Sequence, residues 1–264
     1  MKREKAFTLV ELLVVISIIA LLLSILMPSL NKARLAGQRV VCMNDSKQQM
    51  LFQLMYASDA KGKFPSHKYA EPWYVRAPDG PEETLHAAYK NYVGTGSKVF
   101  VCPALKRFAR EDTVWSGYYA DTTWMNPSLD LGGWDAKHSN GNIPAYIGIP
   151  YNWYNNFDPL GATIDFATYG ETPWAKSLAE CKSTAVSVTH ITSIAPIQNK
   201  MRDRSHGGSV GWGVRPTGNL FASGNKTLDN PVGYADGHVQ MTLKNKMKVR
   251  ASYSLRGNKV QVAY

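Results

Sequence analysis

MKREKAFTLVELLVVISIIALLLSILMPSL, residues 1–30, begins with a short charged head and continues as a long apolar run. The run extends from Phe7 to Met27 and contains a single charged residue, Glu11. As a helix it would be about 31 Å long, and the hydrocarbon core of a bilayer is about 30 Å thick. Residues 7–27 are therefore predicted to form a transmembrane helix.

Glu11 needs a partner in such a helix, because an unpaired carboxylate inside the hydrocarbon costs about 2.5–3.5 kcal/mol or more. Cleavage of the chain between Ala6 and Phe7 would create a cationic α-amine on Phe7. That amine lies one helical turn from Glu11 in the same chain. Between neighbouring chains packed side by side, the amine and the carboxylate would neutralise each other in lipid.

The order Ala6-Phe7-Thr8-Leu9-Val10-Glu11 resembles the processing site of type IV prepilins and type II secretion pseudopilins. The resemblance implies a leader at residues 1–6 that a prepilin peptidase removes, and methylation of the new Phe7 amine. It also implies that Glu11 guides subunit assembly. The usual residue before the cut is Gly, whereas Ala6 stands here, which is also small. The partners implied are copies of this chain, other pilin-like subunits, the prepilin peptidase/methylase and the inner-membrane assembly machinery.

Two other kinds of N-terminal segment explain less of this sequence. A secretory signal peptide has an apolar core of 7–15 residues followed by a small-residue cleavage site, but this run is longer and residues 25–28 offer no such site. A plain membrane anchor explains the length but not Glu11. The basic residues on the two sides of the run are nearly balanced in number, so they do not fix the orientation. The prepilin resemblance implies a single pass through the inner (cytoplasmic) membrane with the rest of the chain outside the cytoplasm, and a filament in the periplasm or on the cell surface after assembly.

The helix is predicted to continue to residue 62. Pro28 should kink it, but no further proline follows before residue 65, and Gly62 is a suitable stop. Apolar residues recur at helical spacing in its second half and are expected to face the core; they are Val40, Met43, Met50, Leu51, Leu54 and Met55. The predicted organisation is a leader at 1–6, one long helix at 7–62 and a globular domain at 63–264.

The rest of the chain carries strand patterns that predict an α+β fold, with the long helix packed on an antiparallel sheet. Residues 98–103 are predicted to be a strand, and 184–198 a strand or two. Asp236-Gly237 is predicted to be the two-residue, type I′ turn of a hairpin. Residues 249–255 and 260–264 alternate between apolar and polar side chains, which predicts an antiparallel ribbon with one buried face.

Residues 113–175 are rich in Trp and Tyr. Exposed aromatic side chains among Asn and Asp would stack on sugars or on a partner protein, whereas buried ones would fill the core of a loop-rich domain. We favour the core interpretation. The glycan- or protein-binding interpretation stays open as the alternative function, a membrane-anchored binding module outside the cytoplasm.

Three cysteines, Cys42, Cys102 and Cys181, lack the spacing of a metal site. Outside the cytoplasm a disulfide would be stable. Cys42–Cys102 is the preferred pair because it would link the long helix to the domain. Three buried free thiols are the alternative.

Residues 203–208 and 234–239 resemble the C-terminal segment of a prepilin-like subfamily named for a His, nine residues, then Asp-Gly. Here 29 residues separate His206 from Asp236, so we predict an insertion between them. Asp203, His206, Asp236 and His238 are candidate ligands for zinc or another transition metal. We favour a structural role for these residues and expect no cofactor.

The formal net charge is +10, but no block of five or more Lys and Arg occurs. Scattered cations are typical of a solvated surface, so no nucleic-acid partner is expected. The chain contains no Gly-x-Ser-x-Gly, no His-Glu-x-x-His and no phosphate-binding loop, and nothing in it argues for an enzyme. The prepilin resemblance therefore implies a filament subunit of a type IV pilus or a type II secretion pseudopilus.

Overall fold

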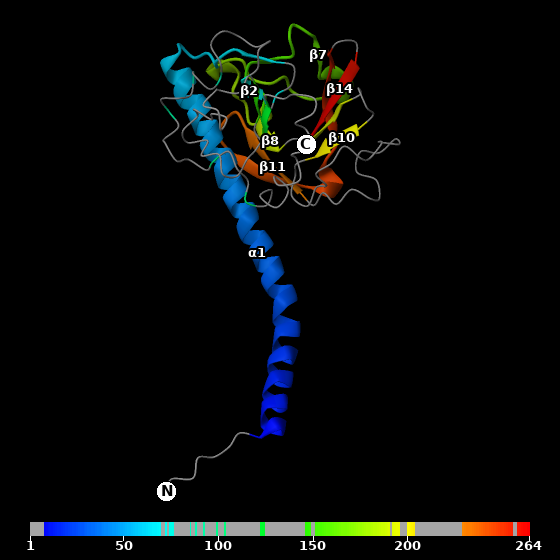
Figure 1. The fold of residues 1–264 in the computed structure, drawn as a ribbon. Helices are drawn as coiled ribbons and strands as arrows, with labels where there is room; N and C mark the ends of the chain where they lie inside the picture. Colours follow the sequence, from blue (N-terminus) through cyan, green and yellow to red (C-terminus); the bar gives the residue numbers. More distant parts are fainter. Residues whose placement is uncertain are drawn as a thin grey trace.

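The chain forms a helical stalk that carries a globular domain at one end (Figure 1). The computed structural model describes residues 8–69, 151–190 and 229–264 except 256–257, with shorter segments at 74–76, 122–124, 146–148, 192–195 and 200–203 and a few single positions. The predicted α+β class is confirmed, because one long helix is combined with antiparallel sheets.

Helix α1 spans Leu9–Asp59 and has 51 residues. Lys61 and Gly62 follow it with positive φ angles, and the Gly62 amide donates to the Ala57 carbonyl at 2.8 Å, an arrangement that closes the end of the helix. The division into a helix at 7–62 and a domain at 63–264 stays a prediction.

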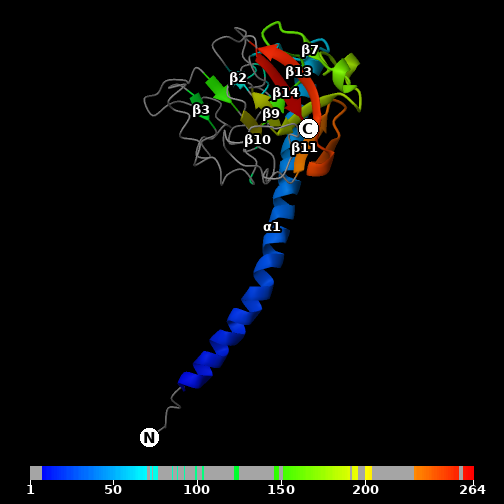
Figure 2. The ribbon, with the colours of Figure 1, turned by 90° about the vertical axis from the view of Figure 1, so that its right-hand side faces the viewer.

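Pro28 lies inside α1, and the helix continues through it. Figure 2 shows the stalk bending gradually along its length. The predicted local kink at Pro28 stays a prediction.

Fourteen short strands are described, and they form four sheets. The first seven are β1 (His67–Lys68), β2 (Tyr74–Arg76), β3 (Thr122–Trp124), β4 (Tyr146–Gly148), β5 (Tyr151–Trp153), β6 (Phe157–Asp158) and β7 (Ile164–Asp165). The others are β8 (Val186–His190), β9 (Thr192–Ala195), β10 (Lys200–Asp203), β11 (Asp229–Tyr234), β12 (Val239–Leu243), β13 (Val249–Leu255) and β14 (Asn258–Ala263). The described part of the chain also contains the 3-10 helices η3 (Ala167–Tyr169), η4 (Leu178–Glu180) and η6 (Lys244–Lys246).

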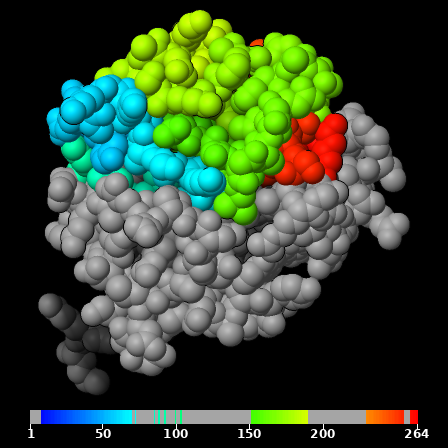
Figure 3. Space-filling model, turned by 90° about the horizontal axis from the view of Figure 1, so that it is seen from above, coloured from blue at the N-terminus to red at the C-terminus, as the bar shows by residue number. Residues whose placement is uncertain are grey.

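The two larger sheets are entirely antiparallel. One has the order β12-β11-β8-β5 and the other β10-β9-β14-β13-β7. The main core lies between them and contains Tyr154, Phe157, Trp174, Val186, Val232, Ala251, Tyr253, Val260, Val262 and Tyr264. Seen from the end away from the stalk, the end of α1, residues 151–189 and the C-terminal strand form one continuous surface (Figure 3).

The second half of α1 packs on β11, β8 and β12. Met50 approaches Gly233 of β11 so closely that a Cβ on Gly233 would lie 2.6 Å from the Met50 Sδ. A residue without a side chain is therefore required at position 233 for the helix to lie this near the sheet.

The face that α1 buries is not the one predicted. Val40, Leu51 and Met55 are 66%, 45% and 52% exposed, and Met50 is the one member of the predicted apolar set that is fully buried. Asp45, Ser46, Gln49 and Gln53 are buried instead, beside Cys42 and Ala57. The prediction was wrong because it scored apolarity alone, whereas the domain offers hydrogen-bonding groups to this face.

Two local predictions need correction. Val99 and Pro103 lie in turns, not in a strand, and the other residues of 98–103 lie outside the described part of the chain. The Val99 carbonyl accepts a hydrogen bond from the Gln49 side chain at 2.8 Å. The Asp236-Gly237 turn is not type I′, because Gly237 has a positive φ of 97° and Asp236 does not.

The other predicted strands are confirmed. Residues 184–198 contain β8 and β9, and 249–264 contain the β13–β14 ribbon. Ala251, Tyr253, Val260 and Val262 all lie on its buried face.

Candidate functional site

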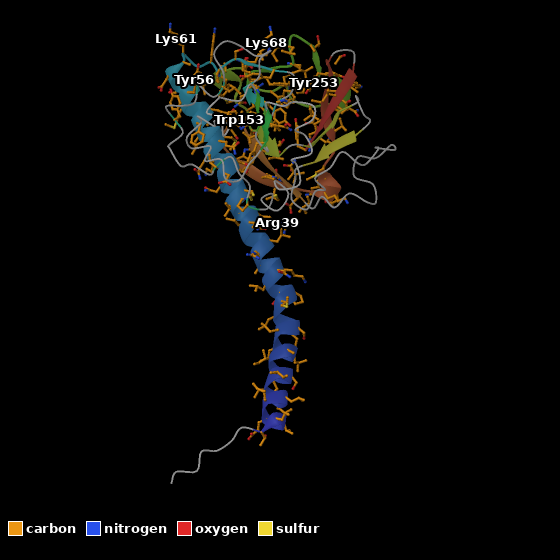
Figure 4. The ribbon with its side chains drawn as sticks, in the orientation of Figure 1. Arg39, Tyr56, Lys61, Lys68, Trp153 and Tyr253 are labelled. Atoms are coloured by element: carbon orange, nitrogen blue, oxygen red, sulfur yellow. The ribbon has the colours of Figure 1, made fainter. Side chains whose placement is uncertain are left out.

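The first half of α1 stands free of the domain. All residues from Leu9 to Arg34 are exposed, and an 18-residue window within α1 has a mean hydropathy of 3.0 with none of it buried. The apolar side chains project from the stalk in every direction (Figure 4). By length and composition this segment can cross a membrane, and no part of the domain covers it.

Glu11 and Thr8 form the first turn of the helix together. The Glu11 Oε2 accepts from the Thr8 backbone amide at 2.8 Å and from the Thr8 hydroxyl at 2.7 Å. In return, the Glu11 amide donates to the Thr8 Oγ1 at 3.2 Å. This is a capping box, which satisfies amide groups that the helix start otherwise leaves unpaired.

Sequence reasoning missed this local role of Glu11. The signal is present as Thr8-x-x-Glu11 ahead of an apolar run, the usual pattern of a capping box. Ala6 and Phe7, the predicted cleavage and methylation residues, lie outside the described residues, so the structure does not place them relative to Glu11.

Residues 1–27 match the family model of the prokaryotic N-terminal methylation motif. No curated protein and no solved structure matches the chain. The motif supports a prepilin-type protein, and together with the apolar helix it supports anchoring in a membrane. It also indicates a structural protein rather than an enzyme.

The second half of α1 is fixed to the domain by buried side-chain hydrogen bonds. The Trp153 Nε1 donates to the Gln49 Oε1 at 2.7 Å. One turn further along, the Asn155 Nδ2 donates to the Gln53 Oε1 at 2.7 Å and to the Ser187 Oγ at 2.8 Å. We call this contact, formed by Gln49, Gln53, Trp153, Asn155 and Ser187, the polar seam.

Asp45 lies on the same face of α1 as the polar seam. It is 6% exposed, and its Oδ2 has no hydrogen-bond partner among the residues that the structure describes. Burial raises the pKa of Asp45 to about 7. Burial, and then the nearby Asp45 carboxylate, raise the pKa of the Tyr151 hydroxyl well above its usual value.

Arg39 joins the stalk to the domain at the domain's lower edge (Figure 4). Its Nη2 lies 2.6 Å from the Oδ2 of Asp229, which is 1% exposed. Because Asp229 begins β11, this ion pair fixes the start of an inner strand of the four-stranded sheet to the helix.

Cys42 is buried and disulfide-bonded, whereas Cys181 is a free thiol. Cys102 lies outside the described residues, so the Cys42–Cys102 pairing stays a prediction.

The four candidate metal ligands are not brought together by the described structure. Asp203 ends β10, and His206 lies outside the described residues. Asp236 and His238 contact each other, with 2.6 Å between Oδ1 and Nδ1, and the His238 ring stacks on Tyr234 at 4.2 Å. Within the described ranges, no group of three or more His, Cys, Asp or Glu could hold a metal.

The described aromatic residues of the segment 113–175 are mostly buried. Tyr151, Trp153, Tyr154 and Trp174 are between 0% and 4% exposed. Tyr154 stacks on Trp174 with ring centroids 4.3 Å apart. These side chains belong to the core and offer no face to a sugar. Tyr169 is partly exposed and accepts a hydrogen bond from the Gln261 Nε2 at 3.3 Å. The remaining Trp and Tyr side chains of the segment lie outside the described part.

Proposed function

We propose that this chain is a structural subunit of a type IV pilus-like or type II secretion pseudopilus-like filament. The observation that carries the proposal is the first half of α1, which matches the N-terminal methylation motif and is apolar on all sides without contact to its own domain. Such a helix needs lipid or other helices around it. In this proposal lipid surrounds it in the precursor, and the helices of neighbouring subunits surround it in the filament.

Processing would occur between Ala6 and Phe7, and the new amine of Phe7 would be methylated. The leader would face the cytoplasm, and the domain would lie outside it. Glu11 of one subunit would then pair with the Phe7 amine of a neighbour, which removes the cost of an isolated carboxylate in an apolar surrounding.

The capping box separates two roles of Glu11 experimentally. Glu11→Gln keeps an oxygen that can accept from Thr8 but removes the charge, whereas Thr8→Val removes the hydroxyl of the cap but keeps the charge. We expect Glu11→Gln and Glu11→Ala to be absent from purified filaments, and Thr8→Val to be incorporated. The mature N-terminus in the native membrane, determined by mass spectrometry, should be methylated Phe7 in the wild type and in all three variants.

Two results would overturn this proposal. One is an intact Met1 start in the native membrane, which would leave a membrane-anchored module. The other is incorporation of Glu11→Gln at the wild-type level, which would limit Glu11 to capping the helix. Binding of glycan by the full chain would support the alternative function, although the described aromatic residues do not favour it.

A further inference from the structure

Two segments of the chain that the structure describes are rich in cations and poor in carboxylates. The segment from Gly237 to Tyr264 contains no Asp or Glu, but it contains Lys244, Lys246, Lys248, Arg250, Arg256 and Lys259. In α1, no acidic residue occurs between Glu11 and Asp45, whereas Lys32, Arg34 and Arg39 do. The two sets of cations come from opposite ends of the sequence.

Internal ion pairs account for some of these cations. Arg39 is paired with Asp229, and Glu171 lies 2.7 Å from Arg250 and 3.2 Å from Lys248. Lys32, Arg34 and Lys246 are exposed, and no acidic partner for them occurs within the described residues. Beside Lys246, Leu243 exposes half of its apolar side chain.

η6 and Arg39 lie at the edge of the domain that faces down the stalk, and Lys32 and Arg34 lie on α1 between this edge and the apolar half of the helix. In Figures 1 and 2, η6, the deep-orange segment at Lys244–Lys246, lies at the edge of the domain that faces down the stalk. Figure 4 shows Arg39 at the same edge. We call Lys32, Arg34, Leu243, Lys244 and Lys246 the stalk-end basic surface.

The length of the stalk puts this surface near a membrane. At about 1.5 Å per residue, Lys32 and Arg34 lie about 8 and 11 Å beyond Met27, and Arg39 about 18 Å beyond it. The headgroup layer is roughly 5–8 Å thick on each side of the hydrocarbon. Lys32 and Arg34 are thus at its outer boundary, and about 10–13 Å separate the domain edge from it.

Tilt of the helix, the reach of the lysine side chains and the range of the electrostatic attraction together span the distance between the domain edge and the headgroup layer. Transmembrane helices tilt by about 20° on average, a lysine side chain extends several ångströms from its backbone, and the Debye length is about 8 Å at physiological ionic strength. An exposed apolar side chain next to lysines, as at Leu243, is also typical of surfaces that enter the headgroup layer.

We propose that the stalk-end basic surface binds the anionic phospholipid headgroups of the membrane that α1 spans. This contact holds the domain against the membrane before the subunit enters a filament, and extraction of the helix breaks it. The inference rests on the proposed placement of α1 in the membrane, but not on assembly.

Hydrogen exchange of the full-length protein in nanodiscs tests the contact. One nanodisc contains phosphatidylcholine alone, and the other contains phosphatidylcholine with about a third of phosphatidylglycerol. We expect slower exchange of the amides of residues 243–248 in the anionic nanodisc, and loss of the difference in high salt. Residues 61–69, at the opposite end of the domain, should exchange equally in both.

Two double variants that remove the same charge separate this local contact from the general attraction of a basic protein to an anionic membrane. Each lysine near an anionic membrane contributes about a fivefold factor in binding. Lys244→Gln/Lys246→Gln should therefore reduce the ratio of docked to undocked domain by about 25-fold. Lys61→Gln/Lys68→Gln removes the same charge from the far end (Figure 4) and should leave the protection of 243–248 unchanged.

Three outcomes would overturn the proposal: equal protection of 243–248 in both nanodiscs, equal protection in the Lys244→Gln/Lys246→Gln variant and the wild type, or an equal loss in both double variants. The same data report on residues 9–27. If those amides are unprotected, α1 has not inserted and the proposed function is at fault; if they are protected, the lipid contact alone is being tested. Protection of β11 and β13 shows that each variant is folded.

Discussion

Asp45 is an ionisable side chain with almost no access to solvent and no described partner for its Oδ2. Its pKa is raised from 3.8 to about 7 by burial. The folded state therefore binds a proton more tightly than the unfolded state does. Stability from this group is present in full below about pH 4, decreases as the pH rises toward 7, and is lost above it.

Replacement of Asp45 by Asn should remove that dependence. We expect the wild type to lose of order 2–4 kcal/mol of unfolding free energy between pH 4 and pH 8 through this residue, and Asp45→Asn to show a correspondingly smaller loss and a higher melting temperature at pH 8. Thermal unfolding of the full chain in detergent, followed by Trp fluorescence, measures both. Asn44→Asp places a carboxylate on the exposed neighbouring position and should leave the pH dependence as in the wild type; parallel pH profiles of Asp45→Asn and the wild type would contradict the prediction.

The contact between α1 and β11 depends on the missing side chain of Gly233. An alanine Cβ there would come within 2.6 Å of the buried Met50 Sδ. We expect Gly233→Ala to destabilise the domain by about 1–3 kcal/mol, because overpacking forces the helix or the strand to move. In a double-mutant cycle with Met50→Ala, the combined loss of unfolding free energy should be smaller than the sum of the single losses.

Gly37 provides the matched control for this substitution. It lies on the exposed part of α1, and a Cβ there meets nothing within 4 Å. Gly37→Ala should raise the helix stability by up to about 1 kcal/mol. Strict additivity of Gly233→Ala and Met50→Ala would show that the close approach does not limit the packing.

At the level of elements, local patterns predicted some features and not others. Continuous apolarity predicts the first half of α1, and period-two alternation predicts the β13–β14 ribbon. Both patterns depend on neighbours in sequence. The polar seam does not. Gln49 and Gln53 are buried because Trp153 and Asn155, about a hundred residues away, supply their hydrogen bonds. Helical spacing of apolar residues cannot reveal a partner of that kind.

The sequence likewise predicted one part of the candidate functional site and not the other. The order from Ala6 to Glu11 is a local motif, so the sequence pointed to it directly. The stalk-end basic surface needed the fold, because it combines cations of α1 with those of η6, which lie about two hundred residues apart in the sequence.

For the whole molecule, Cys42 is disulfide-bonded, and sequence reasoning predicts that this bond connects the stalk to the domain. If the partner is Cys102, the bond closes a loop of about 60 residues and contributes roughly 4 kcal/mol in the chain-entropy account. Cys42→Ser should therefore lower the melting temperature strongly, and Cys181→Ser, which replaces a free thiol, should change it little.

A non-reduced tryptic digest identifies the partner. The prediction requires a cross-linked pair of peptides covering residues 40–47 and 99–106, which reduction separates. A link between residues 40–47 and the peptide of Cys181 would contradict it.

The position of Cys42 along α1 has a mechanical consequence. A subunit that is drawn out of a bilayer by its stalk experiences a pulling force that enters the domain from the N-terminal side. That force reaches the Arg39–Asp229 pair and the covalent bond at Cys42 before it reaches Gln49 and Gln53. These two connections therefore take up load before the hydrogen bonds of the polar seam, and Asp229 passes its share to β11.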